Sequence, residues 1–458
     1  MDFQYVDTLI DASLAAMEKD LAALVRYPSV QAAPGAPGAP FGAAVRGALE
    51  ETLRITKRLG FTAEDMDGYC CYADAAGKGE EMVGVLGHLD IVPADARDWK
   101  YDPFTMTKED GKLYGRGTMD DKGPMIAALY GMKALLNAGF EPDKTVRFIF
   151  GCNEETGMLC MDHYIAHAPC PRGGFTPDGE WPLIVGEKGI MHYQLNADWD
   201  AAGAAAGAKL VKIESGAAAN VVPAAATAVL RDAGELPAAE GLRFEKNGRD
   251  LTLTMLGAAA HASTPEEGEN ALAKLLRYLS KLDFGPAGAK KYVDTMARLT
   301  ADELHGAAMG VNTADALSVT TNAPTVCRLD ETGAEMTLDM RFRLSDKMDF
   351  YIDHLTKLAA ENGLTFVKET CQNPLYLGND NPLGQQLLES YREVTGDMTE
   401  PLVIGGGTYA KKMEGFLAFG PEPLGAPTRA HQANEYFTED ELLTAAKIYA
   451  RAIYRMAK

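Results

Sequence analysis

Basic charge is scarce in this chain. It has 458 residues and a formal net charge of −21 at pH 7, because 65 acidic residues outnumber 44 basic ones. The sequence contains no basic stripe with interleaved aromatic residues, and a phosphate backbone would be repelled by the excess of acid. Nucleic acid is therefore not an expected partner.

Long apolar runs are also absent. No stretch approaches the ~18 apolar residues that a membrane span needs. The first residues, Met1 to Asp7, have neither the basic segment nor the apolar core of a signal peptide. We therefore expect no membrane partner and a cytoplasmic location.

Cysteine pairs with the spacing of a metal or redox motif are missing as well. The seven cysteines are odd in number, and no Cys-x-x-Cys pair occurs. This argues against a disulfide framework and against a thiolate zinc site. Cys152 precedes Glu154 by two residues, and we interpret it as a small buried residue at a strand end rather than as a nucleophile.

The first part of the chain alternates between helical and strand patterns. Apolar spacing predicts an amphipathic helix over 6–26 and further helices over 43–59 and 124–138. Short apolar runs at 82–87 and 145–150 predict buried strands. Such alternation indicates an α/β fold with helices on a sheet, and the chain length predicts two or three domains.

The pattern changes near residue 192. Apolar and polar residues alternate with period two over 251–255 and 336–341, which predicts half-exposed strands. A helix is expected over 270–282, and the Ala/Gly-rich stretch 198–208 indicates a surface loop. The middle section therefore reads as an α+β unit, and long amphipathic helices return from about residue 377.

Candidate metal ligands follow the predicted strands. His88 and Asp90 stand at i and i+2, so on an extended backbone both side chains point to the same face. A metal-bound histidine usually gives its other ring N–H to an acceptor, often a carboxylate, and Asp90 is a candidate for that acceptor. Alone, such a pair is equally typical of ordinary polar residues.

The acidic motifs have alternative readings too. One carboxylate of the Asp120-Asp121 pair is able to bridge two cations, or to cap the helix that follows at Pro124. Glu154 and Glu155 aim in different directions, so one can ligate a metal while the other meets a water on that metal. They can equally be a solvated acidic pair.

Two further candidates are weak in isolation. Asp178 stands in a Pro-Asp-Gly turn sequence, and a lone histidine such as His431 is usually structural. Together, however, the motifs supply five candidate ligands and a spare carboxylate, which is enough for a two-metal hydrolase.

The order and spacing of these motifs resemble the zinc-dependent aminoacylase/carboxypeptidase G/dipeptidase superfamily of metallopeptidases, and within it the dipeptidase V (Xaa-His dipeptidase) branch. The resemblance runs nearly end to end and includes residues 24–30, 186–190 and the segment around His431. It implies an α/β catalytic domain with a mixed sheet flanked by helices, over 1–191 and 377–458. A two-lobed α+β lid domain over 192–376 would interrupt it.

The resemblance also implies a ligand set for two divalent metal ions: His88, Asp120, Glu155, Asp178 and His431. In it the Asp120 carboxylate bridges both ions. His88 and Asp178 complete one metal site, and Glu155 and His431 complete the other.

Two more roles follow from the same resemblance. Glu154 would be the general base, and Asp90 would hold His88 in its tautomer. Imidazole and carboxylate ligands without thiolate suit zinc, the default, and also manganese or cobalt.

Substrate-binding roles are implied for four residues of the middle and final sections: Asn220, His261, Arg341 and Thr408. Asn220 would contact substrate and His261 would steady the developing oxyanion. Arg341 would bind the terminal carboxylate in a two-point fork, and the loop 405–410, which contains Thr408, would line the pocket. Lys411 stands where an arginine is expected, and Arg343 where relatives often have proline.

We therefore expect a hydrolase of dipeptides or short peptides with a free C-terminal carboxylate. The middle section spans about 185 residues, long enough for two lobes, so we expect a monomer that closes over its substrate. One alternative is an N-acyl amino acid deacylase or desuccinylase with the same metal site. Another is a metal-free, non-enzymatic binding protein, and no feature supports a structural protein.

Overall fold

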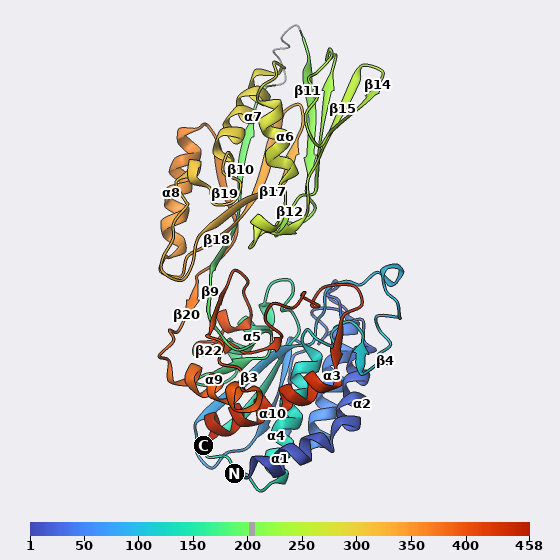
Figure 1. The fold of residues 1–458 in the computed structure, drawn as a ribbon, viewed down its shortest axis with the longest axis vertical. Helices are drawn as coiled ribbons and strands as arrows, with labels where there is room; N and C mark the ends of the chain where they lie inside the picture. The colour runs from blue at the N-terminus through green and yellow to red at the C-terminus, as the bar shows by residue number, and fades with distance from the viewer. Residues whose placement is uncertain (201–206) are drawn as a thin grey trace. The chain divides into compact units, whose positions relative to one another are not determined.

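The chain forms two compact units (Figure 1). The computed structural model describes residues 1–200 and 207–458. Unit 1 comprises Met1–Gly186, Leu377–Leu402 and Thr408–Lys458, and unit 2 comprises Glu187–Tyr376 and Val403–Gly407. The first crossing between units lies a few residues before the expected bound at 191, and the short return of 403–407 to unit 2 was not expected. The division of the inserted segment into two lobes stays a prediction.

Unit 1 is built on a mixed sheet. Its strand order is β1-β2-β6-β3-β7-β22-β9. The strands are β1 (Thr62–Met66), β2 (Cys70–Ala75), β3 (Met82–His88), β6 (Thr145–Gly151), β7 (Gly174–Thr176), β9 (Ile184–Glu187) and β22 (Phe416–Ala418). The central strands β6, β3, β7 and β22 run parallel, whereas β1, β2 and β9 pair antiparallel. After their first residue, β3 and β6 are buried throughout, as expected for parallel strands covered on both faces.

Seven α-helices are described in unit 1: α1 (Phe3–Asp11), α2 (Leu14–Val25), α3 (Ala43–Leu59), α4 (Lys122–Asn137), α5 (Leu159–His167), α9 (Pro382–Thr395) and α10 (Glu439–Ala457). Helices α4 and α10 pack against each other and against β3. Helix α10 begins with a capping box between Thr438 and Glu441, which satisfies its first amide groups.

The helix expected over 6–26 is interrupted. It is divided into α1 and α2 at Ala12 and Ser13. The Ser13 hydroxyl donates to the Leu9 carbonyl oxygen at 2.8 Å, and its amide donates to the Ile10 carbonyl oxygen at 2.9 Å. The apolar spacing continued across this break, so periodicity alone did not reveal it.

Short elements complete unit 1. Strands β4 (Thr107–Glu109), β5 (Lys112–Tyr114) and β24 (Tyr436–Thr438) form a small sheet, and β8 (Gly179–Glu180) pairs with β23 (Pro421–Glu422). The remaining pieces are the 3₁₀ helices η1 (Ala96–Asp98) and η4 (Tyr409–Lys411) and the strand β21 (Leu402–Ile404), of which only Leu402 belongs to unit 1.

Unit 2 is built on one antiparallel sheet, in the order β14-β15-β13-β11-β17-β18-β10-β19. Its strands are β10 (Gly189–Asp198), β11 (Lys209–Ser215), β13 (Ala225–Arg231), β14 (Leu242–Asn247), β15 (Asp250–Leu256), β17 (Thr321–Leu329), β18 (Gly333–Phe342) and β19 (Thr365–Gln372). Alternate residues of β10 and β13 are buried, so one face of each strand packs on the core. The loop expected over 198–208 falls partly on 201–206, outside the described residues.

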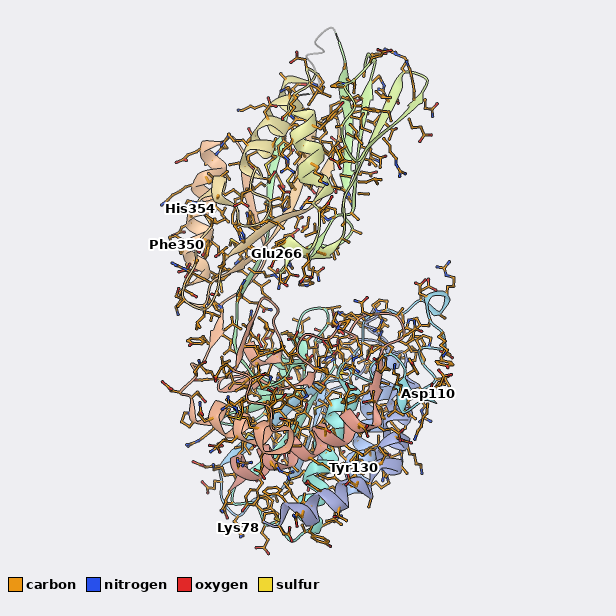
Figure 2. The ribbon with its side chains drawn as sticks, viewed as in Figure 1. Lys78, Asp110, Tyr130, Glu266, Phe350 and His354 are labelled. Atoms are coloured by element: carbon orange, nitrogen blue, oxygen red, sulfur yellow. The ribbon has the colours of Figure 1, made fainter. Side chains whose placement is uncertain are left out.

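Three described α-helices cover the core of this sheet: α6 (Ala271–Leu279), α7 (Ala287–Leu299) and α8 (Met348–Glu361). On α8 the ring of Phe350 stacks on that of His354, with centroids 6.3 Å apart (Figure 2). The unit also contains β12 (Val221–Val222), which pairs with β16 (Ala260–His261), and β20 (Leu375–Tyr376), η2 (Pro265–Glu267) and η3 (Ala307–Met309).

The expected α/β fold class is confirmed. Strands and helices alternate along unit 1, and its sheet is mixed. Among the described residues, no helix is both long and apolar enough to cross a bilayer.

Candidate metal centre

Three neighbouring strands of unit 1 deliver the candidate ligands. His88 is the last residue of β3, Glu154 and Glu155 follow β6, and Asp178 follows β7. These strands are adjacent and parallel, so their carboxyl ends meet at one edge of the sheet. That edge is where open α/β sheets place their ligands.

The Asp120 carboxylate lies between two imidazoles. Its Oδ1 is 2.8 Å from His88 Nε2, and its Oδ2 is 2.9 Å from His431 Nε2. The same His431 nitrogen is 3.1 Å from Glu155 Oε2, and His88 Nε2 is 3.8 Å from Asp178 Oδ2. The structure therefore brings together all five side chains that the sequence singled out as ligands.

Two overlapping groups have the spacing of a metal site. One comprises His88, Asp120 and Glu155, and the other comprises His88, Glu154 and Asp178. Within each group the ligand atoms lie within 4.8 Å of one another. All donors are imidazole nitrogen or carboxylate oxygen, a set that suits zinc and also manganese or cobalt.

Buried carboxylates accumulate negative charge at this edge. Burial, and then the charge of Asp120, raise the pKa of Asp178 to about 7. Burial and the neighbouring Asp178 raise the pKa of Glu154 well above its usual value. A cation among these groups would relieve their repulsion, so the residues present fit divalent metal ions.

For the imidazoles, the neighbouring carboxylates favour the protonated form. Burial alone would lower the pKa of His431, but hydrogen bonds to Asp120 and Glu155 raise it to about 11. For Asp120, burial opposes ionisation, yet the two imidazoles bring its pKa below the usual range. Metal binding at these histidines must therefore release protons.

Asp90 contacts more than the ring of His88. Its two carboxylate oxygens accept the backbone N–H groups of Glu154 and Glu155, at 3.0 and 3.1 Å. His88 Nδ1 lies 2.9 Å from the main-chain carbonyl oxygen of Asp90 but 3.7 Å from its carboxylate. The contact that orients the His88 ring is therefore made by the main-chain carbonyl oxygen of Asp90. The Asp90 carboxylate is instead bound by the backbone of the Glu154-Glu155 loop.

The sequence assigned no role of their own to two buried residues next to the ligands. Asp121 lies behind His88, and its Oδ2 accepts the His88 backbone N–H at 3.2 Å. Glu435 is 1 % exposed and accepts three backbone N–H groups of the loop that carries Asp120. Asp121 directly follows the predicted ligand Asp120, and Glu435 stands four residues after the predicted ligand His431. Nothing in the sequence marks either residue as buried.

His261, in the inserted segment, has a defined tautomer. The Ser263 backbone N–H donates to His261 Nδ1 at 3.1 Å, and the Ser263 hydroxyl lies 2.6 Å from the same nitrogen. Because Nδ1 accepts a proton donor, the neutral ring carries its own proton on Nε2. Asn220 is near in the same unit, since its carbonyl oxygen accepts the Ala262 N–H at 2.9 Å.

Arg341 is already engaged within unit 2. Its Nε and Nη2 donate to the two oxygens of Asp339 at 2.6 and 2.7 Å, and its Nη1 donates to the Gly405 carbonyl oxygen at 2.9 Å. Asp339 also lies 3.0 Å from His192 Nε2. One two-point edge of the guanidinium is therefore used by Asp339, which the sequence reasoning did not foresee.

The remaining residues of interest have local partners. The Thr408 hydroxyl accepts the Ala410 N–H at 3.2 Å and caps η4. Arg343 pairs with Asp346 at 2.7 Å and donates to the Ala314 carbonyl oxygen. Thr408 belongs to unit 1, whereas Asn220, His261 and Arg341 belong to unit 2.

Comparison with known families decides the classification. The sequence profile of peptidase family M20/M25/M40 matches residues 84–455. The chain belongs to this family. It is a metallopeptidase, and the resemblance inferred from the motifs is confirmed.

Curated relatives match over nearly the whole length. The chain is 33% identical over 436 residues to a putative dipeptidase, YtjP, of Bacillus subtilis (strain 168), covering 92% of this chain and 93% of the relative. It is 32% identical over 474 residues to a Beta-Ala-Xaa dipeptidase of Lactobacillus delbrueckii subsp. lactis, covering 100% and 99%.

Solved structures share the fold. Human carnosine dipeptidase 1 aligns with a TM-score of 0.61 at 15% identity, over 100% of this chain and 99% of that one. Aminoacylhistidine dipeptidase from Vibrio alginolyticus aligns with a TM-score of 0.59 at 15% identity, over 99% and 98%. At this identity the likeness establishes the fold alone.

Proposed function

We propose that this chain hydrolyses the peptide bond of dipeptides or short peptides with a free C-terminal carboxylate, using two divalent metal ions. The observation that carries the proposal is the Asp120 carboxylate, which lies within 2.9 Å of both His88 and His431. Relatives named as dipeptidases, alike over nearly their full length, support the substrate class.

The ligands would divide into two positions around Asp120. His88 and Asp178 would serve one ion, and Glu155 and His431 the other, with zinc as the default. In sites of this kind the metal ions polarise the carbonyl oxygen and activate water. The chain's own contribution is to fix these donors, because the Asp90 carboxylate accepts the backbone N–H groups of Glu154 and Glu155 and so holds their loop.

Glu154 is the proposed general base. It would take a proton from the attacking water and pass that proton to the leaving amine. Its carboxylate also falls within ligand distance of His88 and Asp178. A water molecule held between Glu154 and the His88–Asp178 position would therefore be within reach of the Glu154 carboxylate.

Unit 2 would supply substrate contacts. His261 would donate its Nε2–H to the developing oxyanion, an interaction typically worth ~3–4 kcal/mol. Asp339 occupies the Nε–Nη2 edge of Arg341, so we propose that the terminal carboxylate meets the outer edge between Nη1 and Nη2. Asn220 and Thr408 are the other proposed contacts.

Replacing Glu154 by Gln tests the proposal. The variant keeps the size of the side chain but removes the base, so we expect kcat on a dipeptide to fall by ~10²–10⁴-fold. Metal content should stay at the wild-type value. Glu109→Gln, in the same unit and not among the site residues, serves as the control.

Two outcomes would contradict the assignment. A near wild-type rate for Glu154→Gln, with metals intact, would show that Glu154 is not the base. A panel of dipeptides against N-acyl amino acids separates the peptidase from the deacylase or desuccinylase alternative, because both would use the same metal site.

A further inference from the structure

Glu435 connects two segments that are far apart in the sequence. Its Oε1 accepts the backbone N–H groups of Gly117, Met119 and Asp120 at 3.0, 2.8 and 3.2 Å. Its main-chain oxygen accepts the Gly115 N–H at 3.0 Å. One side chain thereby fixes the loop that presents Asp120, although Glu435 and Asp120 are 315 residues apart.

Arg116 completes the connection from the other side. Its Nη1 donates to Glu435 Oε2 at 2.7 Å, with side-chain exposures of 3% and 0%. Its Nη2 donates to the His431 carbonyl oxygen at 3.3 Å. The guanidinium also lies 5.1 Å from the centroid of the Trp99 ring. The pair therefore touches the backbone of both Asp120 and His431.

The His431 loop requires such support. His431 and Asn434 adopt φ of 64° and 62°, in the left-handed region that residues other than glycine rarely occupy. Conformations of this kind persist only where surrounding contacts determine them. Those contacts include the Arg116 hydrogen bond to the His431 carbonyl oxygen and the Lys100 N–H, which donates to Asn434 Oδ1 at 2.6 Å.

A contribution to folding stability does not by itself explain the buried Arg116–Glu435 ion pair. Taking two charges out of water is costly, and a buried ion pair often contributes no more than well-packed apolar side chains. Groups behind metal ligands, by contrast, commonly change metal affinity by 10–100-fold when they are altered.

We propose that Arg116 and Glu435 are positioning residues that set the separation of Asp120 and His431. Through this they determine the affinity of the metal position that His431 completes. The inference rests on the two-metal function proposed above. The effect on the His88–Asp178 position should be smaller, because neither side chain contacts His88 or Asp178 in the described hydrogen bonds and only the shared Asp120 connects them to that position.

Glu435→Gln tests the inference in the full-length protein. Glutamine keeps an oxygen for the three backbone N–H groups but loses the charge that faces Arg116. Zinc binding to metal-stripped protein is followed by competition with a chromophoric chelator. We expect two sites in the wild type, and in the variant one site weakened by ~10–100-fold and the other weakened less.

Asp74→Asn is the matched control. Asp74 pairs with Arg147 at 2.7 Å, with side-chain exposures of 19% and 7%, between β2 and β6 of the same unit. Loss of that pair should leave both zinc affinities at their wild-type values. Arg116→Lys is the second variant if Glu435→Gln fails to fold, because lysine keeps the charge but lacks the fork that reaches both partners.

The outcomes separate the two proposals. Two zinc sites of wild-type affinity in folded Glu435→Gln would overturn the positioning role and leave the two-metal function intact. Equal weakening of both sites would overturn its selectivity for the His431 position. A wild-type chain that binds no second ion would overturn the two-metal function, and the positioning role with it.

Discussion

At the residue scale, the shared Asp120 carboxylate organises the centre. It contacts one histidine from the end of β3 and another from the C-terminal segment, at 2.8 and 2.9 Å. Asp90 and Glu435, two further buried carboxylates, accept backbone N–H groups from the loops that carry the ligands. Ligand geometry is therefore set by acids that we do not assign as ligands.

Ser263 is predicted to act through His261. Its hydroxyl lies 2.6 Å from His261 Nδ1, so Ser263→Ala should weaken the hold on the Nε2–H tautomer. Loss of about 1 kcal/mol corresponds to about a five-fold fall in kcat. KM should change little, because the oxyanion develops only in the transition state.

Histidine nitrogen NMR checks this directly, since it reports which ring nitrogen carries the proton. Ser280→Ala is the control, because the Ser280 hydroxyl donates to the Arg277 carbonyl oxygen in the same unit. An unchanged kcat together with an unchanged tautomer in Ser263→Ala would contradict the role.

Asp339 should make part of unit 2 sensitive to acid. Burial opposes its ionisation, but Arg341 and His192 bring its pKa down to about 2. Because the folded value is depressed, the stabilisation is complete above the unfolded value of about 4 and is lost as pH falls toward about 2.

Asp339→Asn removes this contribution. The difference in opening free energy between wild type and variant should be largest near pH 5 and should shrink as pH falls. Hydrogen exchange of the β18 amides measures it within unit 2. A difference that is constant across this range would contradict the assignment.

At the element scale, the loop between β5 and α4 passes close to the first turn of α4, at Gly123. A Cβ on Gly123 would lie 2.0 Å from the Thr118 carbonyl oxygen and 2.9 Å from the Phe437 ring. Since the first clash is with backbone, the loop that carries Asp120 would have to move. No flexible side chain is available there to yield.

Gly123→Ala should therefore lower both stability and zinc affinity. We expect a loss of about 1–3 kcal/mol in the free energy of unfolding, measured by urea denaturation. Gly234→Ala is the control, because a Cβ there would meet nothing within 4 Å. A variant at Gly123 with wild-type stability and zinc affinity would show that the loop tolerates the displacement.

Sequence patterns located several helices and strands but not the contacts that support them. The helix over 43–59 and the strand over 145–150 correspond to α3 and β6, because apolar periodicity follows burial directly. The break at Ser13 and the role of Glu435 depend on a hydroxyl and on a partner loop far along the chain. Neither leaves a periodic signal.

The candidate ligands were identified from the combined order and spacing of their motifs, because each motif alone is weak. His88 and Asp178 stand beside turn or strand-end patterns that the sequence displays. The pairing of Arg341 with Asp339 also has close spacing, but an Asp-x-Arg pair on a strand does not reveal which guanidinium edge is used. That requires the positions of both side chains.

At the scale of the whole molecule, the chain divides its candidate residues between two units. The metal ligands lie in unit 1, and Asn220, His261 and Arg341 lie in unit 2. We propose that one chain supplies both sets, because the inserted segment is long enough for two lobes. Light scattering should then give the mass of a single chain at all protein concentrations. A stable dimer joined through unit 2 would contradict this.

The central claim is that two metal ions on this chain cleave dipeptides. Metal-stripped protein should be titrated with zinc while hydrolysis of a dipeptide and of an N-acyl amino acid is followed. The account predicts dipeptide turnover that reaches its plateau at two zinc ions per chain, with little turnover of the N-acyl amino acid. Full activity at one ion per chain, or a clear preference for the N-acyl amino acid, would contradict it.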